Sequence, residues 1–166
     1  TDIVYGGMWY ALVDAASLGL ELVPERASTL MLKGSAIKQA IKDKISGMAL
    51  FAGSPAPSVL FYATSAADRA THFLVLESNK FDRSPCGTGT SARMAYLLSK
   101  GILNPDDTYH ARNVFGIPFQ ARLAETAKAS DRDTVVIEIE GKAFVTSAQT
   151  IFFEAGDPLW GGFLSK

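Results

Sequence analysis

Cysteine is the scarcest chemistry-bearing residue in this chain of 166 residues, which contains only one. One cysteine excludes an internal disulfide framework and a cysteine-rich zinc site, so we expect a reducing, cytoplasmic location. No long block of one charge sign is present, and 16 Lys and Arg stand against 17 Asp and Glu, which argues against a nucleic-acid partner. No run reaches the roughly 20 apolar residues of a membrane-spanning helix, so no membrane partner is expected. The amino end lacks an initiator Met and a signal-peptide pattern, so we expect the chain to be part of a longer product.

What remains is the composition of an ordinary globular protein, with 48% hydrophobic and 20% charged residues, at a length close to one domain. Two segments are predicted to be helical. Apolar residues recur at helical spacing over residues 28–48, where Gly34 is expected to interrupt or bend the first part. Residues 88–100 are apolar on nearly all sides, which is typical of a short buried helix.

The rest of the chain is rich in strand-forming patterns separated by turn residues. Strands are predicted over residues 9–14, 59–62, 73–76, 108–114, 119–129, 134–140 and 143–153. The segment between residues 62 and 73 is left open between a loop and a short helix. The predicted fold class is α+β, with antiparallel strands wrapped around one central apolar helix, and not a doubly wound parallel sheet.

One stretch, residues 82–90, carries recognisable chemistry, because it places Cys86 directly before the start of the buried helix. The free N–H groups and the dipole of a helix amino end stabilise a thiolate, and they can also bind a carboxylate. Gly87 and Gly89 let a ligand approach the backbone, while Thr88 adds a hydroxyl. The alternative is that Cys86 is a small buried hydrophobe, but its polar, glycine-rich neighbours disfavour that interpretation.

The sequence of this stretch, Asp-Arg-Ser-Pro-Cys-Gly-Thr-Gly-Thr-Ser-Ala over residues 82–92, resembles the second catalytic-cysteine motif of the proline racemase family. That family includes hydroxyproline epimerases and trans-3-hydroxyproline dehydratases. Residues 5–11, Tyr-Gly-Gly-Met-Trp-Tyr-Ala, resemble its Phe-Gly-Gly-Asn-Phe-Tyr-Ala segment, and residues 116–119 and 156–163 follow in family order. The resemblance covers essentially the whole chain, and it is to the carboxyl-terminal half of the family.

The resemblance implies that residues 1–166 form a single lobe of a two-lobed fold similar to diaminopimelate epimerase, with the active site between the lobes. It implies cofactor-independent inversion at the α-carbon of proline or 4-hydroxyproline by two cysteines, one removing and one returning a proton. Cys86 would be one of these thiols. Asp82 would contact the ring nitrogen, Gly87 and Thr88 would hold the carboxylate, and Leu76 would line the part of the pocket that sets substrate preference. Neither a cofactor nor a metal is implied; the expected partners are the amino-acid substrate and the missing amino-terminal lobe, and a homodimer is left open.

The chain also departs from the family pattern. The first catalytic cysteine lies in a Cys-Gly-His segment upstream of Tyr5 in the family, and no such segment is present here. Residues 110–116 and Ser147 also differ from the usual residues. The competing hypothesis is therefore a non-catalytic relative that binds a small amino acid or a protein partner. Cys86 stands where dehydratases of the family usually carry Thr, which favours a racemase or epimerase.

Other residues have simpler explanations beside their functional ones. Asp82 could cap a turn or pair with Arg83. His72 and His110 are predicted to have surface or packing roles, because neither lies in the context of a Cys–His hydrolase. Three aromatic residues are predicted to belong to the core more readily than to stack on a ligand: Trp9, Tyr10 and Trp160.

Overall fold

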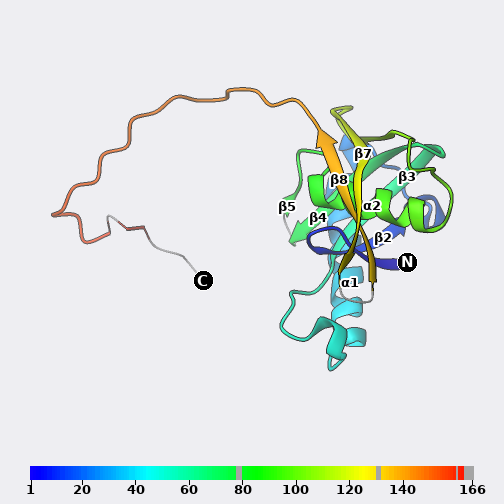
Figure 1. The fold of residues 1–166 in the computed structure, drawn as a ribbon. Helices are drawn as coiled ribbons and strands as arrows, with labels where there is room; N and C mark the ends of the chain where they lie inside the picture. Colours follow the sequence, from blue (N-terminus) through cyan, green and yellow to red (C-terminus); the bar gives the residue numbers. More distant parts are fainter. Residues whose placement is uncertain (78–79, 130–131, 160, 163–166) are drawn as a thin grey trace.

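A computed structural model describes residues 1–77, 80–129, 132–159 and 161–162, and within them a single sheet of eight strands and two α-helices (Figure 1). The strands are β1 (Asp2–Tyr5), β2 (Trp9–Asp14), β3 (Ser58–Ala66), β4 (Arg69–Glu77), β5 (Lys80–Phe81), β6 (Tyr109–Asn113), β7 (Pro118–Ala129) and β8 (Arg132–Glu140). The helices are α1 (Ala27–Ile45) and α2 (Gly87–Ser99), with short 3-10 turns η1 (Ala16–Leu18), η2 (Pro24–Arg26) and η3 (Ala49–Phe51). No helix in these described ranges is long and apolar enough to cross a membrane.

The sheet is mixed: most of its strand pairs are antiparallel, as expected, and two are parallel. The strand order is β1-β2-β3-β4-β6-β7-β8, with β5 paired to β4 beside this path. Strands β2 and β3 are parallel, and so are β4 and β6. A parallel pair needs a long crossover connection, and the two helices provide these: α1 joins β2 to β3, and α2 joins β4 to β6. The α+β class itself is confirmed, because antiparallel pairings make up the rest of the sheet.

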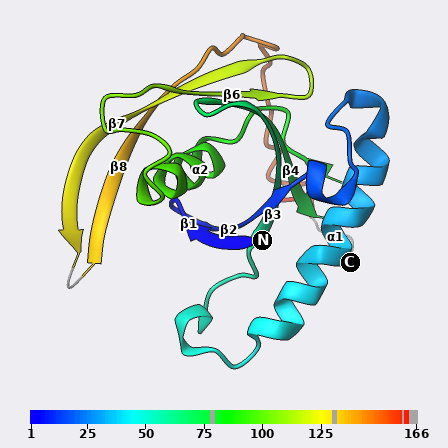
Figure 2. The same cartoon turned by 90° about the vertical axis from the view of Figure 1, so that its right-hand side faces the viewer.

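The sheet curls around α2, which lies inside the curve, while α1 lies outside it (Figure 2). The prediction of a central buried helix is confirmed, with bounds that differ by one residue at each end. Leu60 and Leu74 of the sheet pack with Ala92 of α2 and with Cys86. Farther along the helix, Met94 and Leu97 belong to a second cluster, formed with β4, β6 and β7. The concave face of the sheet therefore packs on α2 through two clusters of buried residues, one at each end of the helix.

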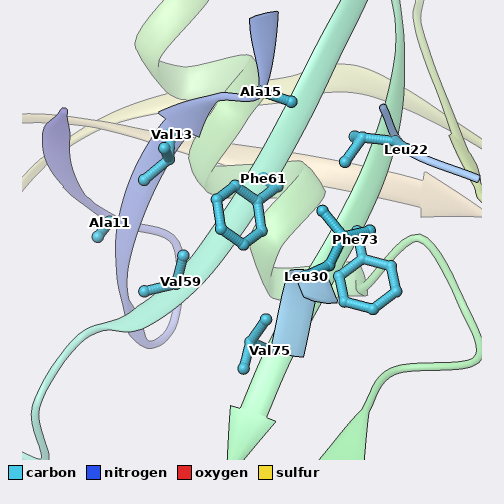
Figure 3. Packing of buried hydrophobic residues seen from close by; sticks show 9 residues of the cluster. All are labelled: Ala11, Val13, Ala15, Leu22, Leu30, Val59, Phe61, Phe73 and Val75. Atoms are coloured by element: carbon cyan, nitrogen blue, oxygen red, sulfur yellow. The ribbon is translucent and has the colours of Figure 1, made fainter. Parts of the chain in front are cut away.

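The convex face of the same sheet is covered by α1 (Figure 2), and Figure 3 shows the apolar side chains of this face and of α1. Successive side chains of a strand point to opposite faces, so Phe61 and Val75 face α1 while Leu60 and Leu74 face α2. The cluster on the α1 side consists of Ala11, Val13, Ala15, Leu22, Leu30, Val59, Phe61, Phe73 and Val75.

Gly34 does not interrupt α1, contrary to the expectation from sequence. It is buried within the helix, and a Cβ atom added there would lie 2.5 Å from Val75 Cγ2 and 3.1 Å from Phe61 Cε2. The glycine is needed for close approach of the helix to the sheet, and not for a bend. The helix also ends at Ile45, three residues before the predicted Met48.

Two other expectations are corrected. The segment between residues 62 and 73 is neither a loop nor a helix, because β3 and β4 extend to Ala66 and from Arg69 and are joined by a tight turn. Residues 143–153 form no strand; the chain leaves the body after β8 as an extended tail (Figure 1). A strand needs a neighbour for its backbone N–H and C=O groups, and the sheet of the described chain ends at β8. The predicted core residue Trp160 lies outside the described residues.

Replacing Gly34 by Ala is expected to destabilise the protein by about 1–3 kcal/mol, because the added methyl group overlaps Val75 on the convex face. In an exposed helix the same change would stabilise, by about 1 kcal/mol. Urea unfolding measures the difference. Adding Val75→Ala to Gly34→Ala makes room for the new methyl group. The double variant should therefore lose less free energy of unfolding than the two single variants lose in sum. An additive loss would contradict the explanation by close approach.

Candidate active site

The only thiol of the chain lies at the amino end of α2. Cys86 is the N-cap residue of this helix, and its Sγ accepts a hydrogen bond from the Gly89 N–H at 3.3 Å. Its side chain is 5% exposed. Cys86 is therefore both a buried residue and a thiol at a helix end, so each of the two interpretations from sequence describes part of its place. Cys86 is the one non-glycine residue of the described chain with a positive φ, 69°. This conformation is uncommon outside glycine, and contacts around the residue must maintain it.

Tyr10 contacts the thiol from the sheet. Its hydroxyl lies 3.4 Å from Cys86 Sγ and 2.6 Å from Thr88 Oγ1. Burial, together with the hydrogen bond to Cys86, raises the pKa of Tyr10 well above its usual value of 10.0, so it keeps its proton at neutral pH. The prediction that Tyr10 is a core residue is confirmed, at 2% exposed. Sequence reasoning missed that its hydroxyl reaches the thiol, because a tyrosine in an apolar strand gives no sign of where its polar end points.

The first turn of α2 offers two unused donors. Within the described residues, the backbone N–H groups of Gly87 and Thr88 donate to no protein acceptor. The two acceptors of Cys86 are used by the next amides, because the Gly89 N–H donates to its Sγ and the Thr90 N–H donates to its carbonyl oxygen. A Cβ atom at Gly87 would meet nothing within 4 Å, and Thr88 is exposed. Free N–H groups at an open helix amino end can bind an anion such as a carboxylate.

The turn formed by Gly6 and Gly7 packs on this same helix start. A Cβ atom at Gly6 would lie 2.5 Å from the Thr88 carbonyl oxygen and from the Ala92 nitrogen. Gly7 has φ of 103° and would place a Cβ atom 3.0 Å from Thr88 Cγ2. The two glycines of the amino-terminal segment are therefore required by the close approach of the β1–β2 turn to the site.

The loop before Cys86 is fixed by polar contacts. Asp82 Oδ1 accepts from the Ser84 N–H at 2.8 Å, and Ser84 Oγ accepts from the Cys86 N–H at 3.0 Å. The Asn113 side chain donates to the Arg83 carbonyl oxygen, and its own oxygen accepts from the Phe115 N–H. One oxygen of Asp82 thus caps a turn, the structural role that its sequence also allowed. Leu76 is 39% exposed on β4, on the same strand face as Leu74, which packs with Cys86.

His72 contacts the same loop from β4, a role that sequence reasoning missed. Its Nδ1 lies 3.2 Å from the Pro85 carbonyl oxygen, and its Nε2 lies 2.8 Å from the Tyr109 hydroxyl. Burial lowers the pKa of His72 from 6.5 to about 4; the hydrogen bond to Pro85 raises it and the charge of Arg93 lowers it further. Of the two roles predicted for His72, surface or packing, the structure supports packing, because the side chain is buried, with 1% exposed. His110 is on β6 and does not approach Cys86 in any contact of the described chain.

No three His, Cys, Asp or Glu side chains gather as a metal site would need among the residues that the structure describes. Two surface hollows lie elsewhere: one at the carboxyl end of α1, lined by Met48 and Phe51, and one beside η1, lined by Leu20 and Arg26. Cys86 lines neither of these two hollows.

The family model described as "Proline racemase" matches residues 1–164. The chain belongs to the proline racemase family. The resemblance of the cysteine motif and of the Gly6–Gly7 segment is thereby confirmed as membership of the family over nearly the whole chain.

Relatives of known name have twice the length. The chain is 33% identical to a 4-hydroxyproline 2-epimerase of Allorhizobium ampelinum, over 98% of this chain and 48% of the epimerase. It is 31% identical to a proline racemase of Clostridioides difficile, over 99% of this chain and 50% of the racemase. The crystal structure of a hydroxyproline epimerase from Agrobacterium vitis with bound trans-4-hydroxy-L-proline superposes with a TM-score of 0.83 at 32% identity, over 99% of this chain and 48% of that one. The chain thus spans about half the length of these proline racemase family members, and its fold matches one lobe of the epimerase.

The buried histidine makes the stability of the protein depend on pH. Because the folded pKa of His72, about 4, is below the unfolded value of 6.5, the unfolded state binds more protons between these values. The stabilisation is fully present above pH 6.5 and is lost as the pH falls toward 4. The loss from this residue between pH 7 and pH 5 should be about 2 kcal/mol.

Urea unfolding at the two pH values measures this loss. The His72→Gln variant offers one donor and one acceptor but does not titrate, so it should lack this part of the pH dependence. The His110→Gln variant is the matched control and should keep it. Equal pH dependence in wild type and His72→Gln would show that His72 is not held neutral.

Proposed function

We propose that this chain is the carboxyl-terminal lobe of a cofactor-independent amino-acid racemase or epimerase that acts on proline or hydroxyproline. In this proposal Cys86 supplies one of the two acid/base thiols. The observation that carries it is the placement of the only thiol beside two free amides, at the amino end of a helix, in a chain of the proline racemase family. The named relatives, and the hydroxyproline bound in the similar structure, support the substrate class.

The difficulty of this reaction is the removal of the α-proton of an amino acid. The neighbouring carboxylate repels the negative charge that develops at the α-carbon. Donors fixed on that carboxylate lower this cost, and the unused N–H groups of Gly87 and Thr88 are suited to the task. The Cys86 thiolate, stabilised by the Gly89 N–H and the helix dipole, takes the proton from one face of the α-carbon. The second thiol, on the opposite face, delivers a proton and completes the inversion.

Two further residues have proposed binding roles. Asp82 Oδ1 is engaged with the Ser84 N–H, and its other oxygen is available to accept a hydrogen bond from the substrate ring nitrogen. Leu76 lies on the face of β4 that bears Leu74, next to the Cys86 cluster, where an exposed apolar side chain can distinguish proline from its hydroxylated form. The part of the active site that encloses the substrate comes from the other lobe.

The second thiol must come from outside residues 1–166, since Cys86 is their only cysteine. The alternative is a relative that binds a small amino acid or a protein partner without turnover. The reading frame upstream of Thr1 separates the two: a Cys-Gly-His segment followed by a β-rich lobe supports the enzyme, and its absence supports the binding protein.

Replacing Cys86 by Ser in the whole product of that reading frame should reduce interconversion of the substrate stereoisomers by at least about 100-fold, because inversion needs both thiols and a positioned acid/base group contributes that much or more. Polarimetry with L-proline and with trans-4-hydroxy-L-proline follows the inversion. Ser99→Ala, at the exposed far end of α2, is the matched control and should leave the rate unchanged. Inversion that survives at the wild-type rate in Cys86→Ser would remove Cys86 from the mechanism.

The 166-residue chain by itself should not interconvert L- and D-proline or the hydroxyproline epimers, because one thiol cannot serve both faces of the α-carbon. Polarimetry of the purified chain with each amino acid tests this. Turnover by the chain alone would contradict the two-thiol mechanism.

A further inference from the structure

Polar side chains form a buried path that runs from the middle of α2 to the peptide before Cys86. The path begins at Arg93, whose positive charge lies close enough to the Tyr109 hydroxyl to act on it. The Tyr109 hydroxyl contacts His72 Nε2 at 2.8 Å, and His72 Nδ1 contacts the Pro85 carbonyl oxygen at 3.2 Å. All three side chains are buried, with 5%, 1% and 1% of Arg93, Tyr109 and His72 exposed. We call these three residues the relay.

The carbonyl end of the relay and its neutral histidine fix the direction of the two hydrogen bonds of His72. A carbonyl oxygen only accepts, so His72 donates to Pro85 through Nδ1–H. The Tyr109 O–H then donates to Nε2, which accepts because the imidazole is neutral. Burial raises the pKa of Tyr109 and lowers that of His72, which keeps both residues in the required protonation state.

The relay ends on a peptide that several hydrogen bonds hold in place. The Pro85 carbonyl oxygen also accepts from Thr90 Oγ1 at 3.3 Å, and the Cys86 N–H on the other side of that peptide donates to Ser84 Oγ at 3.0 Å. The orientation of the peptide between Pro85 and Cys86 is thus held from both edges. Cys86 keeps its positive φ only while these contacts hold, because a non-glycine residue prefers to leave that conformation.

We propose that the relay positions the Cys86 thiol, with His72 as its central positioning residue. By holding the Pro85 carbonyl, the relay keeps Cys86 Sγ between the Tyr10 hydroxyl and the Gly89 N–H. Its importance for catalysis rests on the proposed function. Its effect on the thiol does not, because that effect exists in the chain with no substrate bound.

The competing role for His72 is simple packing, since its ring lies 5.8 Å from the Tyr109 ring, centroid to centroid. The two roles predict opposite outcomes for two substitutions. Phenylalanine keeps a ring but has neither donor nor acceptor. Glutamine loses the ring but keeps one donor and one acceptor, as neutral histidine has. If His72 acts only by packing, His72→Phe should behave like the wild type and His72→Gln should not. If His72 acts through the relay, His72→Gln should behave like the wild type and His72→Phe should not.

Alkylation of the single cysteine by iodoacetamide measures the effect directly on the 166-residue chain, because no other thiol can react. Under conditions where circular dichroism shows a folded protein, we expect His72→Phe to raise the alkylation rate by about tenfold, the factor that corresponds to one lost hydrogen bond. His72→Gln should stay near the wild-type rate. Tyr109→Phe removes only the hydroxyl at the centre of the relay and should also raise the rate, which keeps the test decisive if His72→Phe does not fold.

Gly34→Ala separates local release of the thiol from general loss of stability. This variant is destabilised on the convex face, away from Cys86, so its alkylation rate should stay near that of wild type. The proposal is overturned if His72→Gln reacts as fast as His72→Phe, if Tyr109→Phe reacts at the wild-type rate, or if Gly34→Ala reacts as fast as the relay variants. Because no substrate takes part, a chain without turnover can still confirm the relay, and a failed relay leaves the catalytic proposal untouched.

Discussion

The peptide between Pro85 and Cys86, at the amino end of α2, is the constraint on which the site depends. It starts the buried helix, it carries the only thiol, and it is the one place in the described chain where a non-glycine residue has a positive φ. Side chains from three strands contact this peptide, the thiol or the loop before it: His72 of β4 contacts the Pro85 carbonyl oxygen, Tyr10 of β2 the Cys86 thiol, and Asn113 of β6 the Arg83 carbonyl oxygen. The geometry of Cys86 is therefore a property of the whole sheet and not of the local loop.

The topology explains how these strands come together at one helix end. The two crossovers of the mixed sheet place one helix on each face, and the alternation of side chains supplies both faces with apolar residues. Strand β4 is central to this arrangement, since it pairs with β3, β5 and β6. Its inward residues include both Leu74, which packs beside the thiol, and His72, which holds the loop. Two of the residues that contact the site, Leu74 and His72, thus belong to the strand with the most partners in the sheet.

Local patterns predicted the elements, and long-range pairing decided the rest. Helix α2 could be predicted because an apolar segment with caps carries its own signal, and the cysteine motif could be recognised because it is contiguous. The mixed strand order could not be predicted, because parallel pairing depends on which strand the chain pairs with after a helical crossover. Residues 143–153 have a strand-like sequence but form no strand, because a strand is defined by its neighbour. Gly34, Tyr10 and His72 were misjudged or only partly understood for the same reason: what each one contacts lies far away in the sequence.

In the proposed active site, Cys86 Sγ faces the α-carbon of a bound amino acid whose carboxylate is held by the first turn of α2. A crystal structure of the whole protein with trans-4-hydroxy-L-proline would show this arrangement. We expect the carboxylate on the Gly87 and Thr88 amides and the α-carbon about 3.5 Å from Cys86 Sγ, the separation of reacting atoms poised for transfer. An amino acid bound with its carboxylate away from these amides, or with its α-carbon out of reach of the thiol, would contradict it.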